Sequence, residues 1–293
     1  MSKSKVLDRT LMQAIRANEK HNFLYLNNPK SGCGSVKLNF WVNIEDVRAR
    51  QAVRNLHNVR KSPFCNMISN LTWAENANVF TIVRNPFTRV VSSYLDKISV
   101  PGKRVRREFD MRYGIKDARD ISFDDFVDLI CDDEPEQLDH HWRPQHINVL
   151  ESFVRPNFIG TLESIDRDLP LILNHVLGED IKPVEVSQRH KTGASTSYFD
   201  ILSNRSSVGK LSKLYARDFE VYGYTPDISV STKSSKTAEW TEVKHSELAN
   251  LAKFRTVDVN AQKRQNPALL EKTLGNSDEN LWDGRYRRRF KVA

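Results

Sequence analysis

The order of apolar and polar positions predicts alternating strands and helices. Residues 22–27 and 78–83 are short apolar runs bounded by turn-forming residues, which is typical of buried strands. Each run is followed by apolar residues at helical spacing, in residues 36–41 and 90–95, and residues 157–160 form a further candidate strand. This alternation predicts an α/β fold of three layers, with a central, mainly parallel sheet flanked by helices on both faces.

Other segments have the spacing of amphipathic helices. Leu7, Leu11 and Ile15 recur at helical spacing among charged residues near the N-terminus. Ser122 precedes Asp125 by three residues, as in a capping box that has Asp where Glu or Gln is usual. Further helices are expected over residues 123–130, over residues 162–177 with Pro170 starting or interrupting the helix, and over residues 198–222.

Two stretches lack a clear period. Residues 98–120 are polar and basic, and we expect a long surface excursion there. Residues 225–238 are rich in Ser, Thr and Lys, which is typical of a linker. The chain therefore divides into a main domain over residues 1–224 and a linker with a C-terminal extension over residues 225–293.

Composition narrows the class of protein. The chain has 39% hydrophobic and 28% charged residues, as in an ordinary soluble globular protein. Its apolar runs are far shorter than the roughly 20 residues of a membrane span, and its N-terminus lacks the apolar centre of a signal peptide. Cys33, Cys65 and Cys131 are odd in number and scattered, which favours a reducing compartment. We expect a cytoplasmic protein with no membrane span.

Charge suggests anionic partners without identifying them. The net charge is +8, and basic residues gather in residues 103–107 and 285–291. These two runs are interpreted as a solvated loop and a solvated tail, with a polyanion-binding surface as the alternative.

The turn after the first strand has the chemistry of an anion-binding loop. The first amides of a helix lack intrahelical partners, and Gly32 and Gly34 allow a phosphate to approach them closely. Lys30 adds a positive charge and Ser35 a hydroxyl group. An ATP-binding P-loop would end in Gly-Lys-Ser/Thr, but Gly34 is followed by Ser35 and Val36. A purely structural turn is the alternative for this loop taken alone.

The second strand ends in an arginine. A nucleoside triphosphatase would carry an acidic residue there to hold Mg²⁺, whereas this chain has Arg84. Arg84 can bind a phosphate with two hydrogen bonds, and Ser92 on the following helix can donate another. A nucleotide with phosphates at both the 5′ and 3′ positions would use both loops at once.

Together these motifs resemble those of a known family. Residues 29–37 (PKSGCGSVK) resemble the 5′-phosphosulfate loop of sulfotransferases, and residues 83–94 (VRNPFTRVVSSY) resemble their 3′-phosphate motif. The His140-His141-Trp142 sequence and residues 158–168 follow in the order of the carbohydrate sulfotransferase branch that includes the HNK-1 and chondroitin 4-O enzymes. The resemblance covers residues 22–226.

The chain also departs from this branch. Its Golgi members have a membrane anchor and a cysteine-containing segment after the His-Trp pair, where this chain reads Arg143-Pro144-Gln145. It therefore looks like a soluble, bacterial-type relative, and the departure leaves the acceptor open.

The resemblance implies a P-loop-type fold and a reaction. A hydroxyl of a carbohydrate acceptor would attack the sulfur of PAPS (3′-phosphoadenosine 5′-phosphosulfate) in line, and adenosine 3′,5′-bisphosphate would leave, with no metal required. Lys30 would follow the charge on the leaving oxygen. Arg189 and Lys191 could close over the 3′ phosphate or lie in a solvated loop. The expected donor-binding residues are Lys30, Ser31, Gly32, Cys33, Gly34, Ser35, Val36, Arg84, Ser92, Arg189 and Lys191. No nucleic-acid partner is expected, and the oligomeric state stays open.

The attacking hydroxyl needs a base, and histidine suits neutral pH. His141 aligns with the family's His-Trp position, with His140 as its neighbour, and His57 between the two phosphate motifs is the second candidate. A histidine that only packs beside Trp142 is the structural alternative. A metal site that joins His140 and His141 to Cys131 and His146 matches no usual zinc spacing, so we expect none.

Two other functions share some of these features. A nucleotide kinase would use the same anion loop, but this chain lacks the metal-binding aspartate that such a kinase carries. A non-catalytic polyanion-binding protein would use the two basic runs.

Overall fold

The computed structural model describes residues 15–45, 72–115, 120–178, 181, 183–184, 194–227, 229 and 232–248. One four-stranded sheet organises these residues, in the order β1-β2-β3-β4. Its strands are β1 (Ile15–Asn18), β2 (Phe23–Leu26), β3 (Asn78–Val83) and β4 (Phe158–Thr161). Strands β2, β3 and β4 are parallel, and β1 pairs antiparallel to β2. The predicted α/β fold with a mainly parallel sheet is confirmed.

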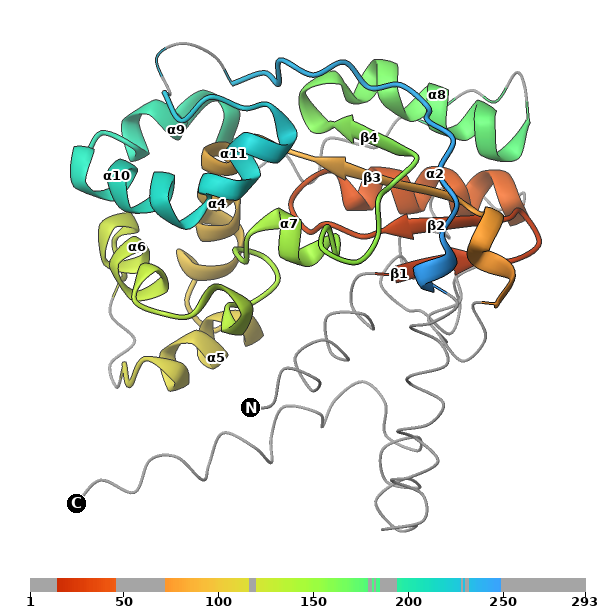
Figure 1. Ribbon diagram of the computed structural model, residues 1–293. Helices are drawn as coiled ribbons and strands as arrows, with labels where there is room; N and C mark the ends of the chain where they lie inside the picture. Colours follow the sequence, from red (N-terminus) through yellow and green to blue (C-terminus); the bar gives the residue numbers. More distant parts are fainter. Residues whose placement is uncertain are drawn as a thin grey trace, which may run out of the picture.

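Helices follow each of the parallel strands, and further helices precede β4 and end the domain (Figure 1). They are α2 (Cys33–Glu45), α4 (Pro86–Ser93), α5 (Arg104–Arg112), α6 (Phe123–Cys131), α7 (Gln145–Asn148), α8 (Ile165–Leu177), α9 (Ala194–Ile201), α10 (Arg205–Leu214) and α11 (Ala216–Tyr222). Shorter helical turns are η2 (Thr72–Asn76), the π-helical η3 (Tyr94–Ile98), η4 (Pro135–Gln137) and η5 (Leu162–Ser164). In the part of the chain that the structure describes, each helix is too short or too polar to span a bilayer.

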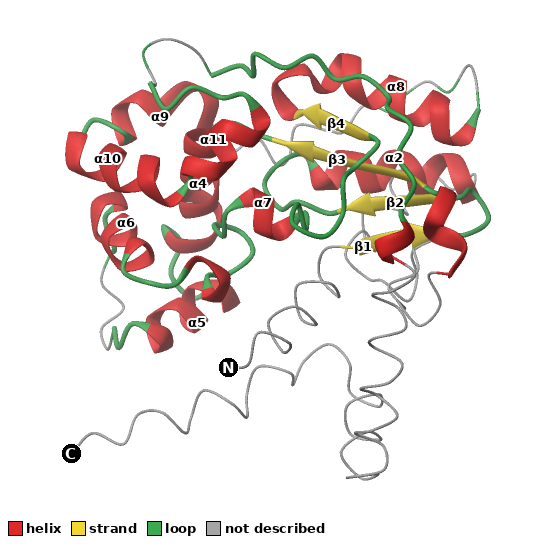
Figure 2. Ribbon diagram, viewed as in Figure 1, coloured by secondary structure: helices red, strands yellow, loops and turns green. Residues whose placement is uncertain are grey.

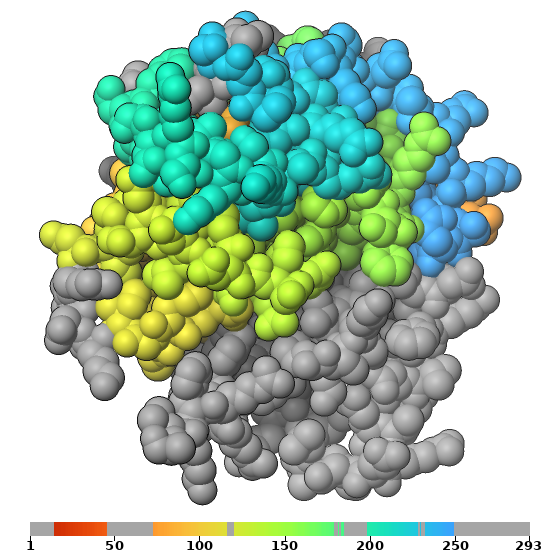
Figure 3. Space-filling view, turned by 60° about the vertical axis from the view of Figure 1, so that its left-hand side comes forward, coloured from red at the N-terminus to blue at the C-terminus, as the bar shows by residue number. Residues whose placement is uncertain are grey.

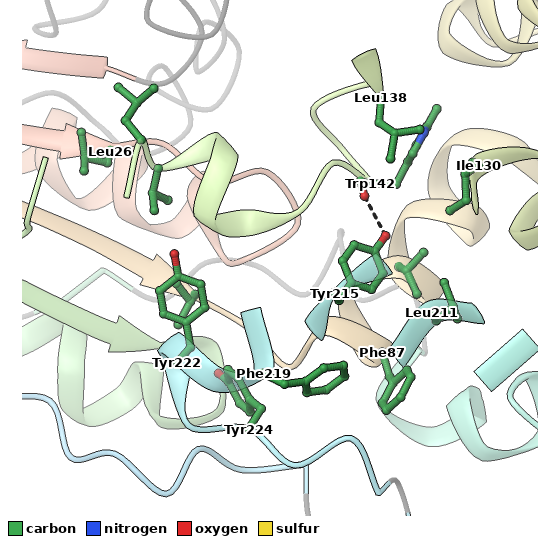
Figure 4. Close-up of a cluster of buried hydrophobic side chains, with 14 of the residues drawn as sticks. Leu26, Phe87, Ile130, Leu138, Trp142, Leu211, Tyr215, Phe219, Tyr222 and Tyr224 are labelled. Carbon is green, nitrogen blue, oxygen red and sulfur yellow. Dashed lines mark hydrogen bonds between the residues drawn. The ribbon is translucent and has the colours of Figure 1, made fainter. Parts of the chain in front are cut away.

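Successive strand residues point to opposite sides of the sheet, and in β2 and β3 the residues on both sides are buried. The cluster on one face packs against α2 and α8 and contains Phe23, Tyr25, Val36, Phe40, Phe80, Ile82, Phe158, Leu169, Ile172 and Leu173. The cluster on the other face joins Leu24, Leu26, Val79 and Val83 to side chains of α4, α6, α10 and α11. Figure 4 shows part of this second cluster, where the Tyr215 hydroxyl donates to the Trp142 carbonyl at 2.7 Å. The strands β2 to β4 point toward the group of helices that contains α4 and α11 (Figure 2).

The helix predicted from the spacing of Leu7, Leu11 and Ile15 is wrong at Ile15, the only one of these three residues that the structure describes. Ile15 begins the strand β1, in which it pairs with Leu26. Ile15 and Ala17 are buried while Arg16 between them is partly exposed, which is the alternation of a strand with one covered side. Pairing with β2 therefore overrides the local spacing, and Leu7 and Leu11 lie outside the described residues.

Several helix predictions need correction in detail. Residues 198–222 form three separate helices, α9 to α11, and α8 continues through Pro170 without a break. The predicted surface excursion over residues 98–120 contains α5, where Arg106 is buried and donates to the Ile98 carbonyl at 2.6 Å. The capping box of Ser122 and Asp125 is confirmed at the start of α6.

The segment over residues 232–248 folds back on the domain. Trp240 stacks on His175 with ring centroids 3.7 Å apart and contacts Phe158 at 5.0 Å. The Asn157 carbonyl accepts from the Thr241 amide at 2.9 Å, and Leu248 is fully buried. Part of the predicted linker and extension thus packs against the sheet, beside the end of α8 (Figure 1). In the space-filling view the segment lies on the surface against the green part of the chain (Figure 3). The division after residue 224 stays a prediction.

Candidate active site

The carboxyl ends of the three parallel strands bring the predicted site residues to one edge of the sheet. Strand β2 leads through Lys30 into α2, β3 leads through Arg84 into α4, and β4 leads through Glu163 into α8. This is the edge where open α/β sheets bind their ligands.

The loop after β2 depends on an unusual backbone. Lys30 and Gly32 both have positive φ angles, 67° and 76°. A Cβ atom on Gly32 would lie 2.9 Å from Leu162 Cδ1, and the positive φ angle also disfavours other residues, so this position favours glycine. Helix α2 begins at Cys33, and the Val36 amide donates to the Gly32 carbonyl at 3.1 Å. The predicted residues Ser31 to Val36 therefore form the last part of the loop and the first turn of α2, where the helix dipole is positive.

Lys30 and Arg84 lie next to each other. The Arg84 Nη1 atom donates to the Lys30 carbonyl at 3.2 Å, and its Nε atom donates to Thr88 Oγ1 at 2.9 Å. Burial lowers the pKa of Arg84 to about 10, against the opposing effect of the Glu163 carboxylate. The guanidinium therefore stays positive at neutral pH, next to the loop that carries Lys30.

Lys30 forms an ion pair with Asp96, which is shared with two more lysines. The Asp96 carboxylate lies 3.0 Å from Lys30 Nζ, 3.1 Å from Lys97 Nζ and 3.3 Å from Lys103 Nζ. Burial acts to raise the pKa of Asp96, but the ammonium groups of Lys30 and Lys97 outweigh it and hold that pKa well below its usual range. Burial also lowers the pKa of Lys30, and Asp96 opposes this shift. Three ammonium groups around one carboxylate leave a net positive charge beside the loop.

Helix α4 connects the anion loop to the two histidines. The buried Arg89 donates from Nε to the Pro29 carbonyl and from Nη2 to the His140 carbonyl, both at 3.0 Å. One turn later the Ser93 hydroxyl lies 2.6 Å from the His141 carbonyl. Ser92, the serine that the sequence predicted for phosphate binding, is also buried on α4. Sequence reasoning missed Arg89 and Ser93, although their spacing of four residues places both on one face of the helix.

Asp139 holds His141 by two contacts to one oxygen atom. Asp139 Oδ1 accepts from the His141 main-chain amide at 2.9 Å and lies 2.6 Å from His141 Nδ1. A carboxylate can only accept, so Nδ1 carries the hydrogen, and in the neutral imidazole Nε2 is then the proton acceptor. Burial acts to raise the pKa of Asp139, but His140 and His141 outweigh it and hold that pKa far below its usual range. This arrangement suits a general base.

The same turn has potential metal ligands. Ligand atoms of Asp139, His140 and His141 all lie within 4.8 Å of one another. The His146 Nδ1 atom lies 2.8 Å from Asp218 instead. A metal site, if one forms among the described residues, would therefore use Asp139 in place of the Cys131 and His146 considered from the sequence.

A buried amide connects the two anion-binding loops. Gln145 has no exposed surface, and its Oε1 atom accepts from Asn28 Nδ2 at 2.8 Å, the Arg84 amide at 2.9 Å and Ser31 Oγ at 3.2 Å. Its Nε2 atom donates to the Arg84 carbonyl at 2.7 Å. Sequence reasoning noticed Gln145 only as a departure on the expected acceptor side, whereas the structure places it between the loops.

Glu163 joins the start of α4 to Tyr224, which lies just after α11. It accepts from the Asn85 amide at 2.8 Å and from the Tyr224 hydroxyl at 2.8 Å. Burial raises the pKa of Glu163, although these hydrogen bonds act in the opposite direction. The Glu163 carboxylate thus holds the loop that contains Arg84, and Glu163 also lies just before the start of α8.

Three predicted site residues fall outside the described residues, namely His57, Arg189 and Lys191. Their roles stay predictions.

Comparison with known proteins gives a consistent family. The family model described as "Sulfotransferase family" matches residues 13–225. Carbohydrate sulfotransferase 14 of Danio rerio is 25% identical over 237 residues, which cover 74% of this chain and 63% of the relative. The Homo sapiens protein of the same name is 24% identical over 241 residues, covering 74% of this chain and 61% of the relative. Carbohydrate sulfotransferase 10 of Xenopus laevis is 26% identical over 249 residues, covering 74% and 69%.

The chain thus spans less than two thirds of the length of the two carbohydrate sulfotransferase 14 relatives. No solved structure matches it significantly.

Proposed function

This chain belongs to the sulfotransferase family, and we propose that it transfers a sulfuryl group from PAPS to a hydroxyl of a carbohydrate acceptor. The observation that carries this proposal is the contact between the two cationic loops, in which Arg84 Nη1 donates to the Lys30 carbonyl at 3.2 Å. Two neighbouring anion sites at adjacent strand ends suit a single nucleoside with phosphates at both ends of its ribose.

Each loop has a distinct role toward the donor. The first turn of α2 and the loop before it hold the 5′ phosphosulfate, because helix amides and the helix dipole favour an anion there. Arg84 binds the 3′ phosphate through its planar guanidinium. Lys30 stabilises the charge that develops on the oxygen between phosphorus and sulfur, and Asp96 keeps its other two lysine partners when Lys30 turns to the donor.

The chemical step is an in-line displacement. The acceptor oxygen attacks sulfur, the bond between sulfur and the 5′-phosphate oxygen breaks, and adenosine 3′,5′-bisphosphate leaves. His141 Nε2 takes the proton of the attacking hydroxyl, and Asp139 holds the opposite ring nitrogen at 2.6 Å. The cations of the protein can balance the charge of the transferring group without a metal.

Donor binding is the first test. Adenosine 3′,5′-bisphosphate should raise the melting temperature without Mg²⁺, and Arg84→Ala should weaken its binding by about 100-fold, because a buried charge pair is lost. Arg104→Ala is the matched control, since Arg104 is half exposed on α5 and pairs with Glu108. Stabilisation by ATP with Mg²⁺ instead would favour a nucleotide kinase.

Turnover is the second test. A screen of carbohydrate acceptors with radiolabelled donor identifies the substrate, and His141→Ala should then lower turnover by about 10²-fold or more while sparing donor binding. Normal turnover in this variant would assign the base to His140 or His57.

A non-catalytic polyanion-binding protein is the remaining alternative. It would show an affinity for polyanions that falls steeply with salt and survives Lys30→Ala.

We also propose a cytoplasmic location, based on three scattered cysteines, and cell fractionation tests it.

A further inference from the structure

The buried side chain of Gln145 lies where the two anion-binding loops meet. Its Oε1 atom accepts from Asn28 and Ser31 of the first loop and from the main-chain amide of Arg84 in the second. Its Nε2 atom donates to the Arg84 carbonyl at 2.7 Å. Both main-chain polar groups of Arg84 are therefore held by one amide that also holds the first loop.

Gln145 is itself fixed from the opposite side. Its main-chain amide donates to Asp218 Oδ2 at 2.7 Å, and the next amide, that of His146, donates to Asp218 Oδ1 at 2.9 Å. Asp218 lies on α11 and is fully buried. Gln145 begins the short helix α7. Because α7 is anchored in this way, it cannot move with either loop separately, and a shift of one loop relative to the other would break hydrogen bonds inside the protein.

The contacts on the first loop extend this connection into the sheet. Asn28 Nδ2 also lies 3.1 Å from Ser31 Oγ and 3.2 Å from the Ile82 carbonyl of β3. Asn28 is fully buried. The end of β2, the end of β3 and the start of α2 thus share one network of hydrogen bonds around Gln145.

We propose that Gln145 couples the two anion-binding loops and thereby makes the site selective for a nucleoside that carries both a 5′ and a 3′ phosphate over one that carries a single phosphate. This inference rests on the proposed donor and adds the residue that sets the spacing between its two phosphate sites. Gln145 acts as a positioning residue, because its polar atoms are engaged with the protein and it sets the position of Arg84 relative to the first loop.

The measurable quantity is the advantage of the second phosphate. It is the dissociation constant of 5′-AMP divided by that of adenosine 3′,5′-bisphosphate, both measured by calorimetry on the full chain. In Gln145→Met, which keeps the side-chain volume but loses the amide, this ratio should fall about tenfold, as expected for the loss of one to two hydrogen bonds. The dissociation constant of 5′-AMP itself should change by less than about threefold, because the first loop keeps its own helix start.

A matched control separates coupling from general destabilisation. Asn157 is another buried amide that bridges segments of this chain, but it lies before β4, at the opposite edge of the sheet. Asn157→Ala should lower the melting temperature and leave the ratio unchanged. Asn28→Ala approaches the same network from the first loop and should lower the ratio, which keeps the proposal testable where Gln145→Met does not fold.

The outcomes are distinct. A wild-type protein that binds adenosine 3′,5′-bisphosphate no better than 5′-AMP would overturn the proposed function and the coupling with it. A wild-type advantage that persists in Gln145→Met, or in Asn28→Ala where Gln145→Met does not fold, would overturn the coupling alone, as would equal weakening of both nucleotides. In an Arg84→Ala background the effect of Gln145→Met on the ratio should disappear, because Gln145 acts through Arg84.

Discussion

Single side chains in this protein act mainly by holding other groups in place. Arg89 donates to the carbonyls of Pro29, His140 and Arg143, and has almost no exposed surface. An arginine buried in this way serves as a fixed hydrogen-bond donor between segments, because its planar group offers several N–H bonds in one geometry. The position of His140 relative to the anion loop therefore depends on Arg89.

Asp139 offers a test at the scale of one residue. Asp139→Asn keeps an oxygen that accepts from the His141 amide but loses the negative charge beside the imidazolium formed in the reaction. We expect turnover to fall by about 10²-fold with little change in donor affinity. Steady-state rates at saturating donor and acceptor measure the effect, with the dissociation constant of adenosine 3′,5′-bisphosphate as the control. A variant as active as the wild type would reduce Asp139 to a turn-forming residue.

At the scale of elements, the turn between β2 and α2 sets the position of the donor loop. Gly32 has a positive φ angle, and Leu162 of the neighbouring β4 connection lies against it. The backbone of the turn thus depends on Gly32, and Leu162, more than a hundred positions later in the chain, packs against it. The connections that follow β2 and β4 thus pack against each other, although β3 lies between these two strands in the sheet.

Two glycine substitutions should have opposite effects on stability. Gly32→Ala combines an unfavourable φ angle with a contact at 2.9 Å, so it should lower the free energy of unfolding by about 1–3 kcal/mol. Gly209 lies exposed in α10, and apart from its chain neighbours and the nearby backbone of the helix, no atom lies within 4 Å of the position that an alanine Cβ would take there. Gly209→Ala should therefore raise the free energy of unfolding by about 0.5–1 kcal/mol. Urea unfolding measures both, and a Gly32→Ala protein of wild-type stability would contradict the preference for glycine at this position.

At the scale of the whole molecule, the segment over residues 232–248 closes the edge of the sheet opposite the candidate site. Asn157 Oδ1 accepts from the Val79 amide at 2.8 Å and from His245 Nε2 at 2.7 Å, and Asn157 Nδ2 donates to the Thr241 carbonyl. The His245 amide donates to the Glu75 carbonyl at 2.8 Å. The segment therefore ties the starts of β3 and β4 together, while Gln145 ties the ends of β2 and β3.

This contact predicts a pH dependence of stability. Burial lowers the pKa of His245, and Glu247 at 3.5 Å opposes the shift. Because the folded-state pKa is lower than the unfolded value of about 6.5, the unfolded chain binds the proton more readily between the two values. The stabilisation is complete above about pH 6.5 and is lost as the pH falls through the folded-state pKa.

His245→Gln provides the comparison, since the glutamine amide can still donate to Asn157 but does not titrate. Urea unfolding between pH 7.5 and 5 should show a smaller loss of stability on acidification in this variant than in the wild type. Equal slopes would mean that other groups control the pH dependence.

Local chemistry alone determined the two strand-turn-helix units of the site. Apolar runs, turn residues and helix starts are properties of neighbouring residues, so β2, β3, the loop with Lys30 and the position of Arg84 followed from the sequence. The same reasoning placed β4 within one residue of its observed bounds and the capping box of α6 at the observed residues. The family motifs supplied the expected reaction.

Tertiary structure decided which buried polar groups meet. Gln145 contacts Asn28 across 117 positions of the chain and Arg84 across 61, and no local pattern specifies such partners. The strand β1 was misread as helical for the same reason, because its partner β2 rather than its own spacing selects the conformation. Buried hydrogen-bond partners depend on how the layers pack, and that packing is a property of the whole fold.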